Sequence, residues 1–157
     1  MTNKITLFKD DNGFLSNFFP CHIVLDGVQY PSVEHAFQAA KATWNDKHTY
    51  VDFSGNKVTI LARDYIKIAR TPGEAKRRGK RIKLRQDWEN MKLEVMESLV
   101  RQKFDNDWYL AERLVKTGNA ELIENNWWGD TFWGMSSGKG ENNLGKILMR
   151  IREGLRR

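Results

Sequence analysis

The chain has 157 residues, of which 40% are hydrophobic and 29% are charged. This length suits one compact domain with a substantial core, so we expect a single domain over residues 1–157. No stretch approaches the roughly 18 apolar residues of a membrane span, and the start, MTNKITLFKDDNG, lacks the apolar run of a signal peptide. Cys21 is the only cysteine, which excludes an intrachain disulfide and makes a cytoplasmic location the expected one.

The formal net charge of +6 indicates an anionic partner such as a phosphate or a nucleic acid. The excess of positive charge is concentrated in the segment KRRGKRIKLR, residues 76–85. A solvated helix face without a partner is the alternative, and no zinc finger, RNA-recognition or leucine-zipper pattern accompanies the run. Three histidines and one thiol show no metal-ligand spacing, so we expect no metal site.

The first elements in chain order are strands. KITLFK, residues 4–9, alternates apolar and polar side chains, as a strand does. HIVLDGVQY, residues 22–30, places Asp26-Gly27 between two strand-forming runs, which predicts a tight hairpin. We expect Pro31 to end the second strand.

Helices follow. Ser32 is a candidate N-cap for a helix over residues 32–42. In residues 56–70, apolar side chains recur at helical spacing, which predicts a second helix. A short basic helix is expected to begin at Pro72, because proline suits the first turn.

The C-terminal half adds three amphipathic patterns and two short strand patterns. We expect helices over residues 86–104, 107–118 and 142–155, and strands within residues 120–126 and 131–135. Gly118 would stop the middle helix, and Asn142 or Asn143 would cap the last one. Helices dominate, so the predicted class is α+β, a mainly helical domain with a small β-sheet.

The helix over residues 32–42 carries a polar row beside its apolar face. Glu34, Gln38 and Lys41 follow one another at helical spacing, at the border where a helix can edge a cleft. Partial burial there would move the pKa of both charged groups toward neutrality, which suits an acid or base and an amine nucleophile. Alternatively, Glu34 and Lys41 only complement the helix dipole.

A second unusual stretch is ENNWWGDTFWGMSSGKGENNLGKIL, residues 124–148. Its three tryptophans are costly to expose and surround Asp130, while Gly138 and Gly140 precede the last helix, where free N–H groups can bind phosphate. It lacks the P-loop and Rossmann spacings. The alternative is a hydrophobic corner with a glycine-rich turn. Trp88 is either a core residue or a platform for stacking a base.

Four blocks together carry a specific resemblance. FLSNFFP, LDGVQYPSVEHAFQAAKA, EAKRRGKRIKLRQDWENMKLEVM and NWWGDTFWGMSSGKGENNLGKILMRIRE occur in order from about Phe14 to Glu153. This sequence resembles the YbiA-like or NADAR family. The resemblance implies a YbiA-like fold and N-glycosidase chemistry, on N-ribosyl intermediates of early riboflavin synthesis or on ADP-ribose attached to guanine in nucleic acid.

The resemblance also implies roles for individual residues. Glu34, Trp88 and Asp130 match the family's functional glutamate, tryptophan and aspartate, and Lys41 matches its motif lysine. The double tryptophan Trp127-Trp128 departs from some members, so the resemblance does not define which residues form the base pocket. Lys41 would capture ribose C1′ as a Schiff base, or Glu34 would activate water against an oxocarbenium-like C1′.

We therefore expect Glu34, Lys41 and Asp130 to be catalytic. The residues expected to bind substrate are Trp88, His35, Gln38, Asn17, Arg85, Trp133, Gly138, Gly140 and Asn142. The favoured substrate is ADP-ribosylated guanine in nucleic acid, with a ribosylaminopyrimidine phosphate as the alternative. A non-catalytic module that binds ADP-ribose or a nucleotide, and a nonspecific nucleic-acid binder, remain further hypotheses. No cofactor, metal or membrane partner is expected, and the oligomeric state stays open.

Overall fold

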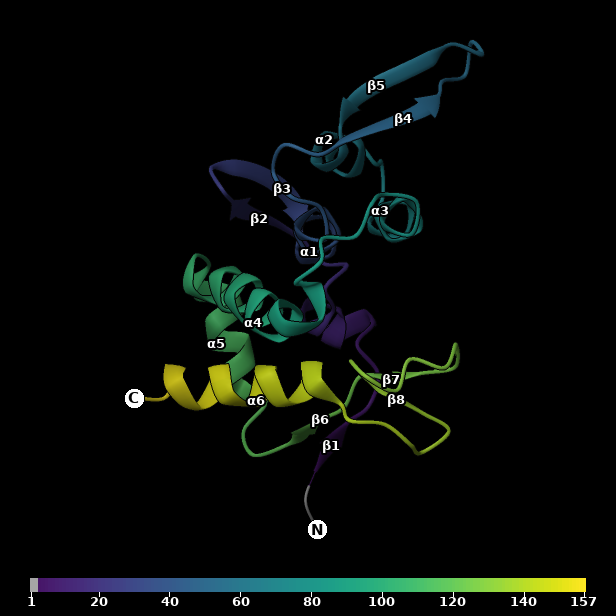
Figure 1. The fold of residues 1–157 in the computed structure, drawn as a ribbon. Helices are drawn as coiled ribbons and strands as arrows, with labels where there is room; N and C mark the ends of the chain where they lie inside the picture. The colour runs from purple at the N-terminus through teal and green to yellow at the C-terminus, as the bar shows by residue number, and fades with distance from the viewer. Residues whose placement is uncertain (1–2) are drawn as a thin grey trace. The chain divides into compact units, whose positions relative to one another are not determined.

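The computed structural model describes residues 3–157, and its contacts divide the chain into two compact units. The central unit comprises Pro20–Leu99. The terminal unit combines the N-terminal part of the chain, up to Phe19, with Val100–Arg157. Figure 1 shows the central unit in blue to teal and the terminal unit in purple, green and yellow. Each unit is described by itself below.

The central unit contains two hairpins and three short helices, and the first part of a long helix. Its elements are β2 (Pro20–Leu25), β3 (Val28–Ser32), α1 (Val33–Ala40), β4 (Lys47–Val51), β5 (Lys57–Leu61), α2 (Ala62–Lys67), α3 (Pro72–Gly79) and the start of α4 (Trp88–Asp105). β2 pairs with β3 and β4 with β5, both antiparallel.

The predicted hairpin at Asp26-Gly27 is confirmed. Both residues have positive φ, 49° and 80°, which the tight turns that match the twist of a hairpin require. The expectation that Pro31 ends the strand is wrong: β3 continues through Pro31 to Ser32, which pairs with Pro20. The pair has only two strands, so proline's missing N–H lies at an edge and removes no bond to a further strand.

The predicted helix over residues 56–70 is half wrong. Lys57–Leu61 is strand β5, which pairs with the unpredicted strand β4, and helix α2 begins only at Ala62. Alternate β5 residues, Val58 and Ile60, are the less exposed ones, which is a period of two. The turn between the strands is held by the Asp52 carboxylate, whose Oδ1 accepts from two backbone N–H groups at 2.9 Å each.

Helix α1 begins where the sequence predicts. The Ser32 hydroxyl accepts from the His35 N–H at 3.0 Å, which confirms the N-cap. α3 begins at Pro72 as expected, with Thr71 as its N-cap. α1 packs against α2, α3 and the β2–β3 hairpin, so all eight of its residues are buried and not only its apolar face.

The terminal unit holds the rest of α4 and the other elements. They are β1 (Lys4–Ile5), the 3₁₀ helix η1 (Asp10–Leu15), α5 (Trp108–Lys116), β6 (Glu121–Leu122), β7 (Asn125–Asn126), β8 (Met135–Ser136) and α6 (Asn143–Leu155). The strand predicted within residues 4–9 is therefore shorter than expected, and residues 120–126 contain two short strands in place of one. The strand predicted within residues 131–135 is largely wrong, because β8 overlaps that range only at Met135. β1 pairs with β6 and β7 with β8, both parallel.

The α+β class is confirmed, although the strands within residues 3–157 form four separate pairs in place of one small sheet. Asn142 occupies the N-cap position of α6, but its side chain makes no cap bond. It instead donates to the Leu122 carbonyl at 2.9 Å and accepts from the Glu124 N–H at 3.0 Å, which ties α6 to β6. No helix in the described part of the chain has the length and hydropathy needed to cross a membrane.

Candidate functional site

The polar row of α1 is buried. Glu34 is 7% exposed and Gln38 is 3% exposed, although both are polar. The Gln38 amide donates to Glu34 Oε1 at 2.8 Å. Burying a charged carboxylate is costly unless hydrogen bonds offset the cost, so a buried glutamate indicates a functional role or compensating bonds.

Lys41 lies directly after α1, with its Nζ 5.7 Å from the centre of the Phe37 ring. Burial lowers the pKa of its amine below the ordinary value, and Glu34 opposes this shift. Three further cations lower the same pKa: Lys76, Lys80 and Lys92. A lowered pKa leaves more of the amine neutral near pH 7, which is the form that attacks a carbonyl or an imine carbon.

Gln38 has a second feature that the sequence did not indicate. Its Oε1 is buried and has no hydrogen-bond partner among residues 3–157. The atom points at the backbone of α3, where a Cβ on Gly79 would lie 1.9 Å from it. Gly79 therefore admits this carbonyl, and the arrangement offers one buried acceptor beside Glu34.

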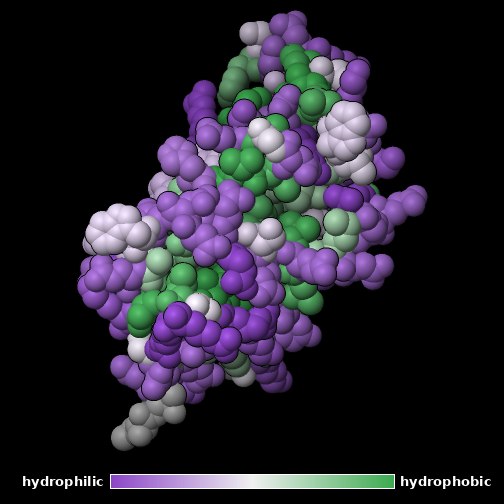
Figure 2. Space-filling view, turned by 90° about the vertical axis from the view of Figure 1, so that its left-hand side faces the viewer, coloured by the Kyte–Doolittle hydropathy of each residue, from purple (hydrophilic) through white to green (hydrophobic). Residues whose placement is uncertain are grey.

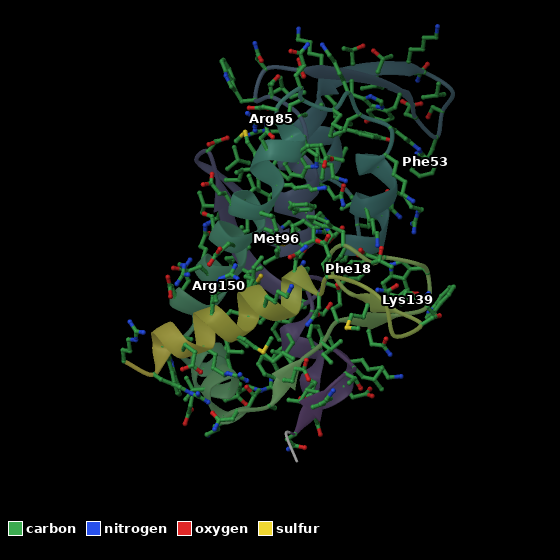
Figure 3. All side chains as sticks on the ribbon, turned by 60° about the horizontal axis from the view of Figure 1, so that its bottom comes forward. Phe18, Phe53, Arg85, Met96, Lys139 and Arg150 are labelled. Atoms are coloured by element: carbon green, nitrogen blue, oxygen red, sulfur yellow. The ribbon has the colours of Figure 1, made fainter. Side chains whose placement is uncertain are left out.

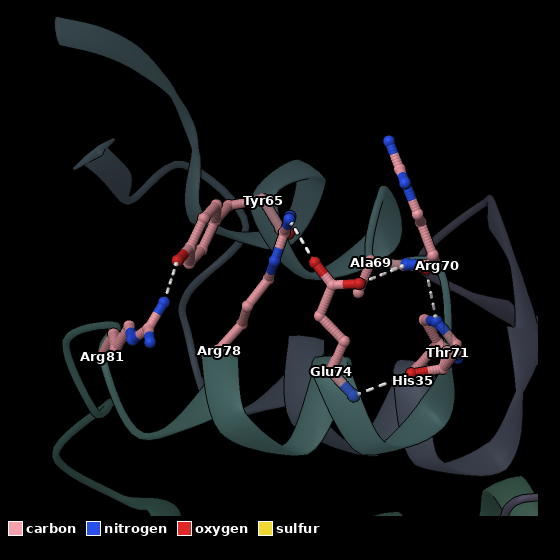
Figure 4. Close-up of polar contacts among 8 residues, drawn as sticks. All are labelled: His35, Tyr65, Ala69, Arg70, Thr71, Glu74, Arg78 and Arg81. Carbon is pink, nitrogen blue, oxygen red and sulfur yellow. Dashed lines mark hydrogen bonds and ion pairs between the residues drawn. The ribbon is translucent and has the colours of Figure 1, made fainter. Parts of the chain in front are cut away.

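Both ring nitrogens of His35 have hydrogen-bond partners inside the central unit. Its Nδ1 lies 2.7 Å from the Ser32 hydroxyl. Its Nε2 lies 3.0 Å from the Ala69 carbonyl, a contact shown in Figure 4. The carbonyl only accepts, so Nε2 carries the proton and Nδ1 accepts from the hydroxyl. Burial lowers the pKa of the ring, which favours this neutral form. Its expected role in substrate binding stays a prediction.

Trp88 and Arg85 also belong to the central unit. Trp88 is 4% exposed and its ring centre lies 5.0 Å from that of Phe37, so the packing favours the interpretation of Trp88 as a core residue. The Arg85 N–H donates to the Lys41 carbonyl at 2.8 Å, and its guanidinium pairs with Asp87. Arg85 also lines a pocket of ≈ 450 Å³ with Trp44 and other residues of this unit.

Asp130 holds a turn in the terminal unit. Its Oδ1 accepts from the backbone N–H groups of Phe132 and Trp133, at 3.1 and 2.9 Å. Asn126 brackets the same residue, donating to its carbonyl at 2.8 Å and accepting from its N–H at 3.0 Å. Within residues 3–157 no hydrogen bond reaches Asp130 Oδ2, so this oxygen is available to a ligand.

The glycine-rich turn is a constrained backbone. Gly140 has φ of 147°, and a Cβ there would lie 2.3 Å from the Gly134 carbonyl, so only glycine fits. Gly138 also has positive φ, 75°. The expectation that tryptophans here pack fails for Trp127, which is 89% exposed.

The structure thus groups the candidates by unit. Glu34, His35, Gln38, Lys41, Arg85 and Trp88 lie in the central unit, and Asn17, Asp130, Trp133, Gly138, Gly140 and Asn142 lie in the terminal unit. Gly79 and Asn126 are not indicated by the sequence, because only the packing of α3 on α1 and the fold of the turn reveal their partners. In the described residues, no three His, Cys, Asp or Glu side chains are grouped to hold a metal ion.

Comparison with known families and proteins places this fold. The NADAR domain model matches residues 6–156, so the chain belongs to that family, as the resemblance implied. It is 38% identical over 150 residues to the N-glycosidase YbiA of Escherichia coli, covering 94% of this chain and 84% of that protein.

Two further comparisons agree. The NMR structure of E. coli YbiA matches with a TM-score of 0.76 and 34% identity, over 99% of this chain and 87% of that one, which confirms the YbiA-like fold. A riboflavin biosynthesis protein of Vibrio vulnificus is 36% identical over 158 residues. That match covers 99% of this chain, but the chain spans only 39% of the Vibrio protein.

Proposed function

We propose that the chain is an N-glycosidase that hydrolyses the bond between ribose C1′ and an exocyclic amine of a base. The observation that carries the proposal is the buried carboxylate of Glu34 in α1 together with Lys41 at the C-cap of that helix, whose pKa is lowered by burial. The lowered pKa of Lys41 favours the neutral amine that nucleophilic catalysis needs, and a buried carboxylate is suited to moving a proton. Relatives that this chain matches over most of its length are named N-glycosidases.

One route runs through a Schiff base. An N-ribosyl amine can open its sugar ring to an imine at C1′, with a proton passing to the ring oxygen. The neutral Lys41 amine adds to C1′, and the base departs as its free amine after Glu34 delivers a proton. Water then hydrolyses the lysine imine and releases the sugar.

The other route needs no covalent intermediate. Glu34 takes a proton from a water that attacks C1′ as the bond to the base breaks, and the same proton is then passed to the departing nitrogen, so that the base leaves as its free amine. In this route Lys41 serves as a cation. In both routes the unpartnered Gln38 Oε1 accepts a hydrogen bond from a sugar hydroxyl or from the leaving amine.

We further propose that residues of the terminal unit hold the substrate. Asp130 Oδ2 would accept from a ribose hydroxyl or stabilise positive charge at C1′. Asn17 and Trp133 would bind the sugar and base. Gly138 and Gly140 would receive a phosphate group. The start of α6 near Asn142, also expected from the sequence to bind phosphate, has no free N–H groups for it, because the N–H groups of Asn142, Asn143 and Leu144 already donate to backbone carbonyls of residues 132–134.

The favoured substrate is ADP-ribosylated guanine in nucleic acid, since the net charge of +6 and the basic run of residues 76–85 suit a polyanion. The alternative, a ribosylaminopyrimidine phosphate, is supported by the name of the Vibrio relative. We place the protein in the cytoplasm, because its one cysteine, Cys21, is a free thiol and the chain carries no disulfide.

The test is incubation with each candidate substrate, followed by mass spectrometry. We expect one substrate to yield free base and released sugar in equal amounts, and the relative rates to identify the preferred substrate. An ADP-ribosylated oligonucleotide, an ADP-ribosylated guanosine and a ribosylaminopyrimidine phosphate should be compared side by side. Stoichiometric binding of all three without any product would establish the non-catalytic module instead.

A further inference from the structure

A second concave surface exists in the central unit. This groove has a volume of ≈ 690 Å³ and runs along the β4–β5 hairpin and the α2–α3 segment. Neither Glu34, Gln38 nor Lys41 lines it. Nothing in the proposed chemistry uses it, yet it combines aromatic rings with arginines.

The aromatic part is centred on Tyr65 of α2. The ring of His48 lies 4.4 Å from that of Tyr65 and the ring of Tyr50 lies 5.0 Å from it, so β4 presents a small aromatic platform. At the hairpin tip, Phe53 is completely exposed (Figure 3). The top of Figure 2, where the hairpin lies, shows hydrophobic residues on the surface among hydrophilic ones. Phe53 lines the same groove as His48 and Tyr50, and accessible rings along one groove suit the stacking of a planar ligand.

The cationic part is held in place by hydrogen bonds. Arg78 donates to the Tyr65 carbonyl and to Glu74, both at 2.6 Å, and its guanidinium lies 4.6 Å from the centre of the Tyr65 ring. Arg81 donates to the Tyr65 hydroxyl at 3.3 Å. The Arg70 side chain extends away from these contacts (Figure 4). Fixed guanidinium groups are well suited to phosphate.

The two carboxylates that line the groove, Asp52 and Glu74, already have hydrogen-bond partners nearby in the chain. Glu74 accepts from the Arg70 N–H at 3.0 Å and pairs with Arg78, and these contacts lower the pKa of its carboxyl. Asp52 accepts from the backbone of the hairpin turn. Three arginines therefore face two carboxylates that are already engaged, so the groove favours an anion.

We propose that this groove binds a single-stranded polynucleotide, with bases stacked on Phe53 and Tyr50 and phosphates held by Arg70, Arg78 and Arg81. Stacking on exposed rings next to a cationic track is the usual means of binding single strands without reading their sequence. The inference rests on the proposed function, which it extends by giving the nucleic acid around the modified base its own binding surface. The Ala69 carbonyl, next to Arg70, accepts from His35 of α1, so a hydrogen bond connects the segment that lines the groove to the helix that carries the polar row.

The test measures fluorescence anisotropy of labelled, unmodified oligonucleotides of about 12 nucleotides, a length within the usual single-strand site sizes. DNA and RNA single strands and a DNA duplex are compared. Phe53→Ala should weaken single-strand binding by about 5- to 100-fold, the range expected for one stacked base. Arg70→Gln should weaken it as well and lower the slope of log affinity against log salt by about 1. Phe53 and Arg70 are both exposed, so neither variant should disturb folding.

Two matched controls lie on the terminal unit. Trp108→Ala removes an exposed ring and Arg150→Gln removes an exposed cation, and both should bind like the wild type. Equal losses in the controls and the groove variants would overturn the proposal, as would a duplex that binds as tightly as the single strand.

The outcome is separable from that of the proposed function. The groove variants should turn over ADP-ribosylated guanosine at the wild-type rate and lose activity only on the oligonucleotide. Phe53-dependent strand binding by a protein that releases no base would refute the glycosidase proposal alone. Normal turnover of guanosine-sized substrate with strand binding independent of Phe53 would refute the groove alone.

Discussion

Helix α1 and the turn around Asp130 both stand out in the sequence as polar groups in apolar surroundings, but the structure treats them differently. In α1, Glu34 and Gln38 are buried and the pKa of Lys41 is lowered by burial. In the turn, Asp130 is only half-buried, accepts from two backbone N–H groups, and is preceded by the exposed Trp127 and Trp128.

The difference shows that local composition does not set the electrostatics of a group. α1 is covered on several sides by α2, α3 and the β2–β3 hairpin, which removes water from its polar row. In the turn, Asp130 accepts from backbone N–H groups of its own segment, and Trp127 is exposed to solvent. This difference is why we propose α1 as the source of the reactive groups and the turn as a ligand contact.

The largest effect is expected at Glu34. Glu34→Gln keeps an acceptor for the Gln38 amide but removes the proton-transferring group, so turnover should fall by about 100- to 10,000-fold. Ligand affinity, measured by calorimetry, should stay within about tenfold, because binding does not need the charge. Retention of most activity would show that Glu34 is not the acid or base.

Lys41 separates the two routes. Lys41→Met keeps a chain over Phe37 but removes the amine, and on the Schiff-base route turnover should fall by about 100-fold or more. Wild-type turnover should rise with pH as the amine loses its proton, with a midpoint below the ordinary lysine pKa of 10.5. Borohydride added during turnover should attach the sugar to Lys41. An unlabelled, active protein would favour direct attack by water.

Substitutions of Asp130 separate a role of its carboxylate in turnover from its role in stabilising the turn. Asp130→Asn retains Oδ1 as the acceptor for the two backbone N–H groups, so unfolding in urea should change by less than about 0.5 kcal/mol. Turnover should fall by about 10- to 100-fold if Oδ2 carries charge to the substrate. Asp130→Ala is the comparison, and it should also lose about 1–3 kcal/mol of stability. An Asn variant of full activity would restrict Asp130 to the turn.

Gly79 tests the position of Gln38. In Gly79→Ala the new methyl group would overlap Gln38 Oε1, so the amide must move away from Glu34. We expect kcat/KM to fall by about tenfold and stability to fall by about 1–3 kcal/mol, the usual cost of overpacking. Gly13→Ala, where a Cβ meets nothing within 4 Å, is the matched control. Equal kinetics in both variants would exclude Gln38 from the site.

His35 should affect stability more than chemistry. Its pKa is lowered in the folded protein, so its contribution is complete above the ordinary value of 6.5 and is lost as the pH falls through the lowered folded value. Urea unfolding of wild type and His35→Gln should therefore converge as the solution is acidified. His48, whose pKa is also lowered, is present in both proteins and cancels. A constant difference across this pH range would show that His35 does not titrate as the burial implies.

Local signals in the sequence located some elements well. Asp26-Gly27 fixed a turn, Ser32 capped α1 and Pro72 opened α3, because each acts on backbone groups within a few residues. The strand β5 was mistaken for helix because Ile60 and Leu61 fit the helical spacing of the following residues. Its partner, β4, lies earlier in the chain, and only the pairing decides between the two periods.

The candidate site divides in the same way. The sequence by itself determined the family, the net charge and the polar row of Glu34, Gln38 and Lys41, since residue types and their spacing are properties of the chain. Only the tertiary structure decided that the row is buried, that Gly79 makes room for Gln38, and that aromatic and arginine side chains of the β4–β5 hairpin and α2–α3 share a groove. The physical reason is that solvent exclusion depends on which distant segments pack together, and the exclusion of water in turn sets the pKa of each group.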